Sequence, residues 1–270
     1  MNHDTLFLPG NPFAHLEAIR VGERPWSFLD RLKGYLLERT GGSDEGADQL
    51  DGYGVVDTVR RPDGSVAEIA LTMTRTLILS RPLRVGPGIV IGAGTMLEAG
   101  AIVKAPSLIG DGCEIRQGAY IRGEVLVGNH VVVGHVTEVK SAVLMDGTAA
   151  GHFAYVGDAI LGARVNLGAG TKIANLQFRN VAEIDTGAIA PVRIRGTGGM
   201  IDTGRAKLGA VIGDYTEIGC NSVTAPGAVV GARCWIYPNT TLPKGFYRGG
   251  ALIRPVGAGK VESIDRLPPL

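Results

Sequence analysis

The sequence predicts an all-β fold built as a solenoid of triangular coils, and two observations support that prediction. Aliphatic residues recur every six positions from Leu79 to Met145 without an exception. A period of six matches neither a helix nor a half-buried strand, so each hexad must be a short extended stretch followed by a corner, and three such sides close a triangle. The chain also contains 41 glycines in 270 residues, and tight corners favour glycine because it adopts positive φ without strain.

The same period defines the solenoid domain, which we expect to span residues 79–245. The aliphatic column returns after residue 160 and again from Ile212 to Leu242, and we expect an inserted loop at 174–207, where the column is lost. The pattern resembles the hexapeptide repeat of the left-handed parallel β-helix, which implies the left hand and coils of three hexads each. Residues three hexads apart should therefore stack on one face of the solenoid, about 4.8 Å apart.

Residues 1–78 lie outside the repeat, and their first part predicts helices. A short helix is expected after Asn11-Pro12. The segment after Pro25-Trp26-Ser27 predicts a second, amphipathic helix, because its leucines have helical spacing, at Leu29, Leu32 and Leu36. We expect this helical segment to cap the open end of the solenoid.

Three further segments complete the regions outside the repeat. The stretch 41–54 is acidic and rich in glycine and is expected to be a linker. The apolar stretches on either side of Arg61-Pro62-Asp63-Gly64 predict a β-hairpin. Residues 246–270 carry no hexad pattern and are expected to form a C-terminal tail.

The composition excludes several classes of protein. The 27 Lys and Arg against 26 Asp and Glu give a formal net charge of +1, without the basic field of a nucleic-acid-binding protein. The cysteines Cys113, Cys220 and Cys234 are too far apart for a disulfide framework or a CxxC metal site. No signal peptide and no apolar run of membrane-spanning length occur. We therefore expect a soluble, cytoplasmic protein without nucleic-acid or membrane partners.

One column of the solenoid concentrates positive charge. Lys104, Arg122 and Lys140 are each separated by three hexads and should stack, with no acidic residue between them in that column. Two unit charges about 4.8 Å apart repel by roughly 1 kcal/mol in water and by several times that at a lower effective dielectric. A bound anion such as a phosphate would relieve this repulsion. The alternative is that the three side chains extend separately into solvent.

The first irregularity in the hexads lies just after this column. The stretch from Met145 to Leu167 falls two positions short of four full hexads. We expect a locally deformed coil there, and deformed turns re-aim side chains. The segment contains three residues suited to a site, His152, Tyr155 and Asn166.

The motifs around this irregularity resemble a known family. The stretches EVKSAVLMDG, GHFAYVGDAILGARVNLGAGT and IAN are similar to the acetyltransferase half of the bifunctional glucosamine-1-phosphate acetyltransferase / N-acetylglucosamine-1-phosphate uridyltransferase family and its archaeal-type sugar-1-phosphate relatives. The resemblance implies acetyl transfer from acetyl-CoA to the amine of an amino-sugar 1-phosphate in a homotrimer, with no metal. Nothing before residue 80 resembles the nucleotide-binding start of the uridyltransferase half, so we do not expect that second activity.

The resemblance also implies roles for individual residues. His152, in GHFAYVGD, matches the catalytic base, and Glu138 matches the glutamate that orients it. Arg122 and Lys140 match the pair that holds the sugar phosphate, and they are also members of the basic column found from spacing alone.

The remaining matches concern the sugar and the acetyl donor. Tyr155, Asn166 and Asn175 match sugar contacts, and Lys207 matches a further phosphate-binding lysine. The backbone N–H near Ala169 would polarise the thioester carbonyl, and Cys220 lies where the family has its coenzyme groove.

Two other functional classes stay open from the sequence. A solenoid of this kind could be a zinc-dependent enzyme resembling the γ-carbonic anhydrases, since His130 and His135 have HxxxxH spacing, although no upstream histidine supplies the third ligand. It could also be a non-catalytic scaffold.

Overall fold

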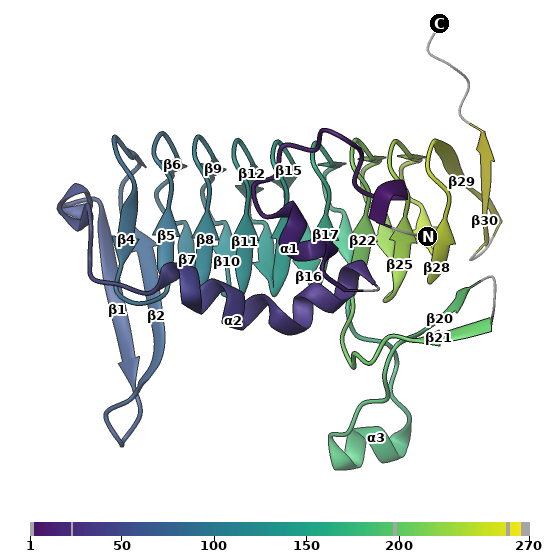
Figure 1. The fold of residues 1–270 in the computed structure, drawn as a ribbon, viewed down its shortest axis with the longest axis horizontal. Coiled ribbons are helices and arrows are strands. Elements are labelled where there is room, and N and C mark those ends of the chain that lie inside the picture. Colours follow the sequence, from purple (N-terminus) through teal and green to yellow (C-terminus); the bar gives the residue numbers. More distant parts are fainter. Residues whose placement is uncertain (1–2, 23, 197–198, 258–259, 266–270) are drawn as a thin grey trace, which may run out of the picture.

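The computed structural model describes residues 3–22, 24–196, 199–257 and 260–265. Three sheets wrap around one elongated core, and the chain passes from one sheet to the next at each corner (Figure 1). Most neighbouring strands within each sheet are parallel and belong to successive coils. The predicted fold class, a parallel β-helix of hexapeptide repeats, is confirmed.

We name the sheets A, B and C. Sheet A contains β4 (Leu83–Val85), β5 (Ile89–Ile91), β8 (Ser107–Ile109), β11 (Val125–Val127), β14 (Ala142–Leu144), β17 (Ile160–Leu161), β22 (Ala210–Ile212), β25 (Ala228–Val230) and β28 (Gly245–Tyr247). Sheet B contains β1 (Gly54–Arg60), β2 (Val66–Met73), β7 (Ile102–Lys104), β10 (Tyr120–Ile121), β13 (Glu138–Lys140), β16 (Tyr155–Gly157), β19 (Lys172–Ile173), β24 (Val223–Thr224) and β27 (Thr241–Leu242). Sheet C contains β3 (Leu77–Ile78), β6 (Met96–Leu97), β9 (Glu114–Ile115), β12 (Val132–His135), β15 (Ala149–His152), β18 (Asn166–Leu167), β23 (Glu217–Ile218), β26 (Trp235–Ile236), β29 (Ala251–Gly257) and β30 (Lys260–Asp265).

The repeat length changes along the solenoid, which corrects one detail of the sequence analysis. Val125 pairs with Ser107 on the preceding coil and with Ala142 on the next coil, and the second step is one residue shorter than the first. As a result Leu144 faces the central core, while the expected core residue Met145 packs outside it, against the N-terminal helices. Residues 150–160 are therefore not deformed. They form the regular strands β15, β16 and the start of β17, in coils that are one residue shorter.

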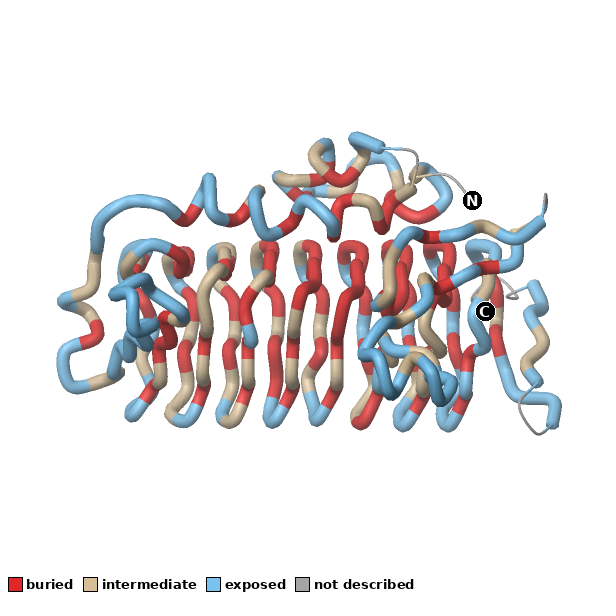
Figure 2. The backbone as a smooth tube through the Cα atoms, turned by 90° about the horizontal axis from the view of Figure 1, so that it is seen from below, coloured by how far each residue is buried: buried red, intermediate tan, exposed pale blue. Residues whose placement is uncertain are grey.

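The N-terminal helices do not cap the end of the solenoid as expected. The helices α1 (Leu16–Arg20) and α2 (Phe28–Thr40), with the 3-10 turn η2 (Pro25–Ser27) between them, lie along the outer face of sheet A (Figures 1 and 2). The cause is the composition of that face. Its outward residues are apolar, and the buried face of α2 packs on them, through Phe28, Leu32 and Leu36 against Leu126, Val143 and Ile160.

Other elements close the ends of the coils. The hairpin β1–β2 forms as predicted and continues sheet B, since Ala70 pairs with Lys104. At the other end the last coil extends past residue 245, because β28 and β29 still pair with sheets A and C, and β30 turns back along β29. Residues 258–259 and 266–270 of the predicted tail lie outside the described residues.

The inserted loop at 174–207 leaves the solenoid after β19 and returns at β22 (Figure 1). It carries α3 (Val181–Thr186) and a hairpin of β20 (Arg193–Gly196) and β21 (Gly199–Asp202), whose tip, residues 197–198, is outside the described residues. The short 3-10 helices η1 (His3–Thr5) and η3 (Ala47–Leu50) complete the elements. Within the described ranges, no helix has the length and apolar character needed to span a bilayer.

Candidate functional site

The outer face of sheet B carries most of the predicted site residues, and it is bounded by two corners. We call the turns that lead from sheet C into sheet B the histidine corner, after His152. We call the turns that lead from sheet B into sheet A the aspartate corner, after Asp158. Along β13 the chain runs from Glu138, next to the histidine corner, to Lys140, next to the aspartate corner, a distance of about 7 Å.

The basic column is present in register. Tyr120 pairs with both Ile102 and Glu138, which aligns three cations: Lys104 and Lys140, which end β7 and β13, and Arg122, which directly follows β10. No acidic residue lies between these cations within the column, but acidic partners reach them from outside it. Each contacts a carboxylate, in the pairs Lys104–Glu68 (2.9 Å), Arg122–Glu138 (2.5 Å) and Lys140–Asp158 (3.8 Å). These carboxylates come from the hairpin, from the neighbouring strand and from the next corner, so the regular spacing within the column does not reveal them.

Tyr155 lies beside Arg122 and Lys140. It is the strand neighbour of Glu138. Its hydroxyl reaches along the sheet over Gly157, where a Cβ would be 2.5 Å from that hydroxyl oxygen and 2.8 Å from Nδ2 of Asn175. Burial raises the pKa of Tyr155, and the carboxylates of Glu138 and Asp158 add to that shift. Gly157 therefore makes room for the tyrosine to turn toward the aspartate corner.

Asp158 is the centre of the aspartate corner. Its side chain is 7% exposed and its φ is +47°, so the residue is held in a left-handed turn under the neighbouring side chains. Nδ2 of Asn175 donates a hydrogen bond of 2.6 Å to one carboxylate oxygen, and Nη2 of Arg205 lies 3.4 Å from the other. Arg205 also pairs with Asp30 of α2. One guanidinium thus ties the inserted loop to both the solenoid and the N-terminal helix.

The same corner holds Lys207. Nε of Arg205 donates to the carbonyl of Lys207, and the N–H of Leu208 donates to the carbonyl of Asn175. Neither Asp158 nor Arg205 is among the predicted site residues. Asp158 ends the GHFAYVGD motif, which was a usable signal, whereas Arg205 lies in the inserted loop, where no repeat position indicates a neighbour.

The histidine corner is different in character. His152 is exposed at the end of β15, and its ring makes no hydrogen bond or ion pair with any described residue, lying 6.0 Å from the ring of Phe153. The resemblance implies that Glu138 orients the imidazole. In the structure its carboxylate instead accepts a hydrogen bond from Arg122. On the following coils the N–H of Gly170 donates to the carbonyl of His152, and that of Asn221 donates to the carbonyl of Ala169.

The position of Ala169 and Cys220 follows from this stacking. Gly168 packs against the backbone nitrogen of Cys220, so Ala169 and Cys220 lie on successive coils of the histidine corner, beyond His152. The proposed base and the proposed donor-side residues therefore share one corner.

Asn166 is the exception among the predicted site residues. It lies on β18 of sheet C, is exposed, and donates a hydrogen bond of 2.8 Å to Glu217. Its strand neighbour is Ala149, so it faces away from sheet B. Within one chain the structure groups Arg122, Glu138, Lys140, Tyr155, Asn175 and Lys207 on or beside sheet B, with His152 at the edge of that face.

The two histidines of the zinc alternative are spread along one coil. His130 precedes β12 and His135 is its last residue, so the two histidines lie at different corners of one coil, separated by about 16 Å of extended chain. Nδ1 of His135 is 3.0 Å from the carbonyl oxygen of Gln117. Among the residues described, no group of three or more His, Cys, Asp or Glu side chains is arranged to hold a metal ion.

Comparison with known proteins supports the resemblance seen in the motifs. A family model described as the GMPPB C-terminal domain matches residues 103–186, a range that contains the EVK and GHFAYVGD stretches. A bifunctional sugar-1-phosphate nucleotidylyltransferase/acetyltransferase of Sulfurisphaera tokodaii is 40% identical over 105 residues, covering 39% of this chain and 24% of that protein. A bifunctional protein GlmU of Methanocaldococcus jannaschii is 35% identical over 100 residues, covering 37% of this chain and 22% of that protein.

The chain thus spans about a quarter of the length of the curated relatives that it matches. Among solved structures, the acetyltransferase domain of PglB from Neisseria gonorrhoeae in complex with acetyl coenzyme A has a TM-score of 0.36 and 16% sequence identity, covering 56% of this chain and 57% of that chain. The similarity of this chain to the bifunctional GlmU proteins, inferred from the motifs, is confirmed.

Proposed function

We propose that this protein transfers the acetyl group of acetyl-CoA to the amine of an amino-sugar 1-phosphate. The observation that carries the proposal is the layout of sheet B. Two adjacent cations, Arg122 and Lys140, lie near one corner, and an exposed histidine, His152, lies at the other. The strand between the corners is about 7 Å long, which suits a sugar ring with an amine at one end and a phosphate at the other.

Arg122 and Lys140 would bind the phosphate. An arginine fork and a lysine ammonium are the usual partners of a phosphate, and charge-assisted hydrogen bonds are the strong ones. The Lys140–Asp158 contact, at 3.8 Å, is long for a hydrogen-bonded pair. A phosphate oxygen can therefore take up the free donors of Lys140 without displacing Asp158.

The reaction needs a base and a donor on the other side of the sugar. The imidazole of His152 takes a proton from the amino group of the sugar while the nitrogen of that amine attacks the thioester carbonyl carbon. The new C–N bond forms, the C–S bond breaks, and the imidazolium returns its proton to the departing CoA thiolate. The N–H near Ala169 donates to the carbonyl oxygen, which becomes negative in the transition state. Cys220 lies further along the same corner, where the CoA chain would run.

The sugar contacts divide between two faces. Tyr155 and Asn175 would hold the ring from sheet B. Asn166 faces outward from sheet C, so it would act only on a sugar bound to another copy of the chain. Such a role for Asn166 would require each site to lie between neighbouring copies of the proposed homotrimer, whose symmetry repeats the same surfaces in every interface.

A thiol-release assay tests the proposal. Wild-type protein is mixed with acetyl-CoA and either glucosamine 1-phosphate or galactosamine 1-phosphate, and free CoA is measured. We expect turnover with at least one acceptor and its loss in His152→Ala. A folded protein that releases no thiol with either acceptor would contradict the proposal and favour a scaffold.

A further inference from the structure

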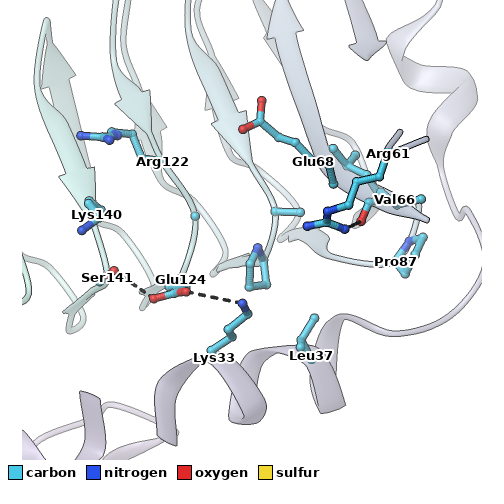
Figure 3. A pocket seen from close by; sticks show the side chains of 15 residues that line it. Lys33, Leu37, Arg61, Val66, Glu68, Pro87, Arg122, Glu124, Lys140 and Ser141 are labelled. Carbon is cyan, nitrogen blue, oxygen red and sulfur yellow. Dashed lines mark hydrogen bonds and ion pairs between the residues drawn. The ribbon is translucent and has the colours of Figure 1, made fainter. Parts of the chain in front are cut away.

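We propose that the preferred acceptor is a nucleoside-diphosphate amino sugar, whose nucleotide half occupies a cavity at the aspartate corner. This inference rests on the proposed acetyl transfer and names the acceptor more closely. It starts from a cavity of about 530 Å³ where α2, the β1–β2 hairpin and the solenoid meet (Figure 3). Ligand sites for small molecules have volumes of about 300–1,000 Å³.

The cavity begins where the phosphate site ends. Arg122 and Lys140 line it, together with the residues that follow them at the aspartate corner, Gly123, Glu124 and Ser141. None of the residues at the histidine corner lines it. A phosphate held by Arg122 and Lys140 would therefore lie between the sugar on one side and the cavity on the other.

The positions of the two corners fix the orientation of the bound acceptor. The amine must point to the histidine corner to reach His152. The phosphate then points to the aspartate corner, and any group bound to the far side of that phosphate must enter the cavity. A sugar 1-phosphate ends at Arg122 and Lys140, on the rim of the cavity, and leaves the rest of it unfilled, whereas a nucleoside diphosphate continues into it.

Two further cations suit a second phosphate. Lys33 comes from α2, and Arg61 comes from the hairpin. Arg61 makes no ion pair with any described residue, and its Nη1 donates only to Oγ of Ser65 and to the carbonyl of Val66. Nζ of Lys33 is 4.0 Å from Glu124, a weak exposed pair of a kind that is worth less than about 1 kcal/mol. Both cations can therefore bind an incoming anion.

The rest of the lining suits an uncharged nucleoside. Its apolar residues come from all three elements and include Leu37, Ile69, Pro87 and Pro106. Glu68 is paired with Lys104, and Glu124 accepts a hydrogen bond of 3.0 Å from Ser141 and lies 4.0 Å from Nζ of Lys33, so each carboxylate of the lining already has a polar or cationic partner. The cavity thus combines cations near the phosphate site with an apolar surface beyond them.

Calorimetric titration tests the cavity directly. UDP, GDP and inorganic pyrophosphate are titrated into wild-type protein and into the variants Arg61→Ala and Lys33→Ala. Arg60→Ala is the matched control, because Arg60 belongs to the same hairpin, does not line the cavity, and bonds only the carbonyl of Gly64. We expect a nucleoside diphosphate to bind at least tenfold more tightly than pyrophosphate, and Arg61→Ala and Lys33→Ala each to weaken it at least fivefold. Affinity equal to that of Arg60→Ala in both variants would overturn the inference.

Turnover separates this inference from the proposed function. The values of kcat/KM are compared for UDP-glucosamine, GDP-glucosamine and glucosamine 1-phosphate with wild-type protein. We expect one nucleotide sugar to exceed the 1-phosphate at least tenfold. Turnover of the 1-phosphate without that preference would overturn the inference and leave the proposed function standing. Turnover of a nucleotide sugar without turnover of the 1-phosphate would support the inference and contradict the 1-phosphate as the acceptor. If none of the three acceptors is acetylated, the proposed acetyl transfer fails, and with it the assignment of the cavity to an acceptor.

Discussion

The two corners of sheet B differ in the burial and the polar contacts of the residues after which they are named. At the histidine corner, His152 is exposed and makes no hydrogen bond or ion pair with the described residues through its ring. At the aspartate corner, Asp158 is 7% exposed and contacts Lys140, Asn175 and Arg205. The corners are only about one short strand apart, so the difference is local.

This contrast matches what each end of a transfer site needs. A base must be free to meet its substrate and to exchange a proton, and partners that bind its ring would compete with that role. A phosphate site must hold positive charges in place before the ligand arrives, and Asp158 and Glu138 do so for Lys140 and Arg122.

The largest expected effect is on turnover. His152→Ala should lower kcat by about 10²–10⁴-fold, because it removes the proposed proton acceptor. The melting temperature should stay within about 2 °C of wild type, since the ring is exposed and lacks a hydrogen-bond partner among the described residues. The control is His135→Ala, which removes the stacked histidine of the preceding coil. Equal losses in the two variants would show that neither ring is the base.

The next effect is on stability. Asp158→Asn should lower the free energy of unfolding by about 3 kcal/mol, because it leaves Arg205, 13% exposed, and Lys140 without the buried charge. Asparagine tolerates the left-handed φ of this turn, so the change tests the charge and not the backbone. Urea unfolding measures it. A loss below about 0.5 kcal/mol, which is typical of an exposed pair, would mean that the aspartate corner is no more dependent on charge than the histidine corner.

A pair of glycines tests the packing at each end. Gly157→Ala would bring a Cβ to 2.5 Å from the hydroxyl of Tyr155, whereas a Cβ on Gly151 meets nothing within 4 Å. We expect Gly157→Ala to cost about 1–3 kcal/mol of stability and to raise KM for the acceptor severalfold by displacing Tyr155. Gly151→Ala should change neither quantity. Thermal unfolding and steady-state kinetics measure both, and equal effects of the two substitutions would refute the packing argument.

The smallest effect concerns the link to α2. Asp30 is 58% exposed where it pairs with Arg205, so Asp30→Asn should cost less than about 1 kcal/mol. The cost should shrink further at 1 M salt, which screens exposed pairs. Unfolding at low and high salt measures it. A salt-independent loss as large as that of Asp158→Asn would place the key charge of the corner on α2 instead.

The repeat made most of the fold predictable, and the wrong placement of Met145 in the core has a physical cause. Val143, Leu144 and Met145 are all aliphatic, so the hexad count cannot tell which of them faces the core when a corner loses one residue. The pattern likewise predicts α2 as an amphipathic helix but not its location. The signal for that location was present in sheet A, where outward residues such as Leu126 and Ile160 are also apolar and need a cover.

The candidate site was predictable where it lies on the repeat and not elsewhere. Arg122 and Lys140 align because the strands that end at them are in register, which spacing predicts. Glu68 and Arg205 reach the site from the hairpin and the inserted loop, and neither segment has a period that relates it to the coils. The partner of Glu138 depends on how far a side chain bends along the sheet, which sequence does not encode in any spacing.

In the proposed reaction, the phosphate is held at one corner of sheet B and the chemistry occurs at the other. Calorimetric titration of glucosamine 1-phosphate into His152→Ala, Arg122→Met and Lys140→Met tests it most directly. We expect the Kd of His152→Ala to lie within twofold of the wild-type value and the Kd of Arg122→Met and of Lys140→Met each to be at least tenfold higher. Binding that is lost with His152 and kept without Arg122 and Lys140 would contradict it.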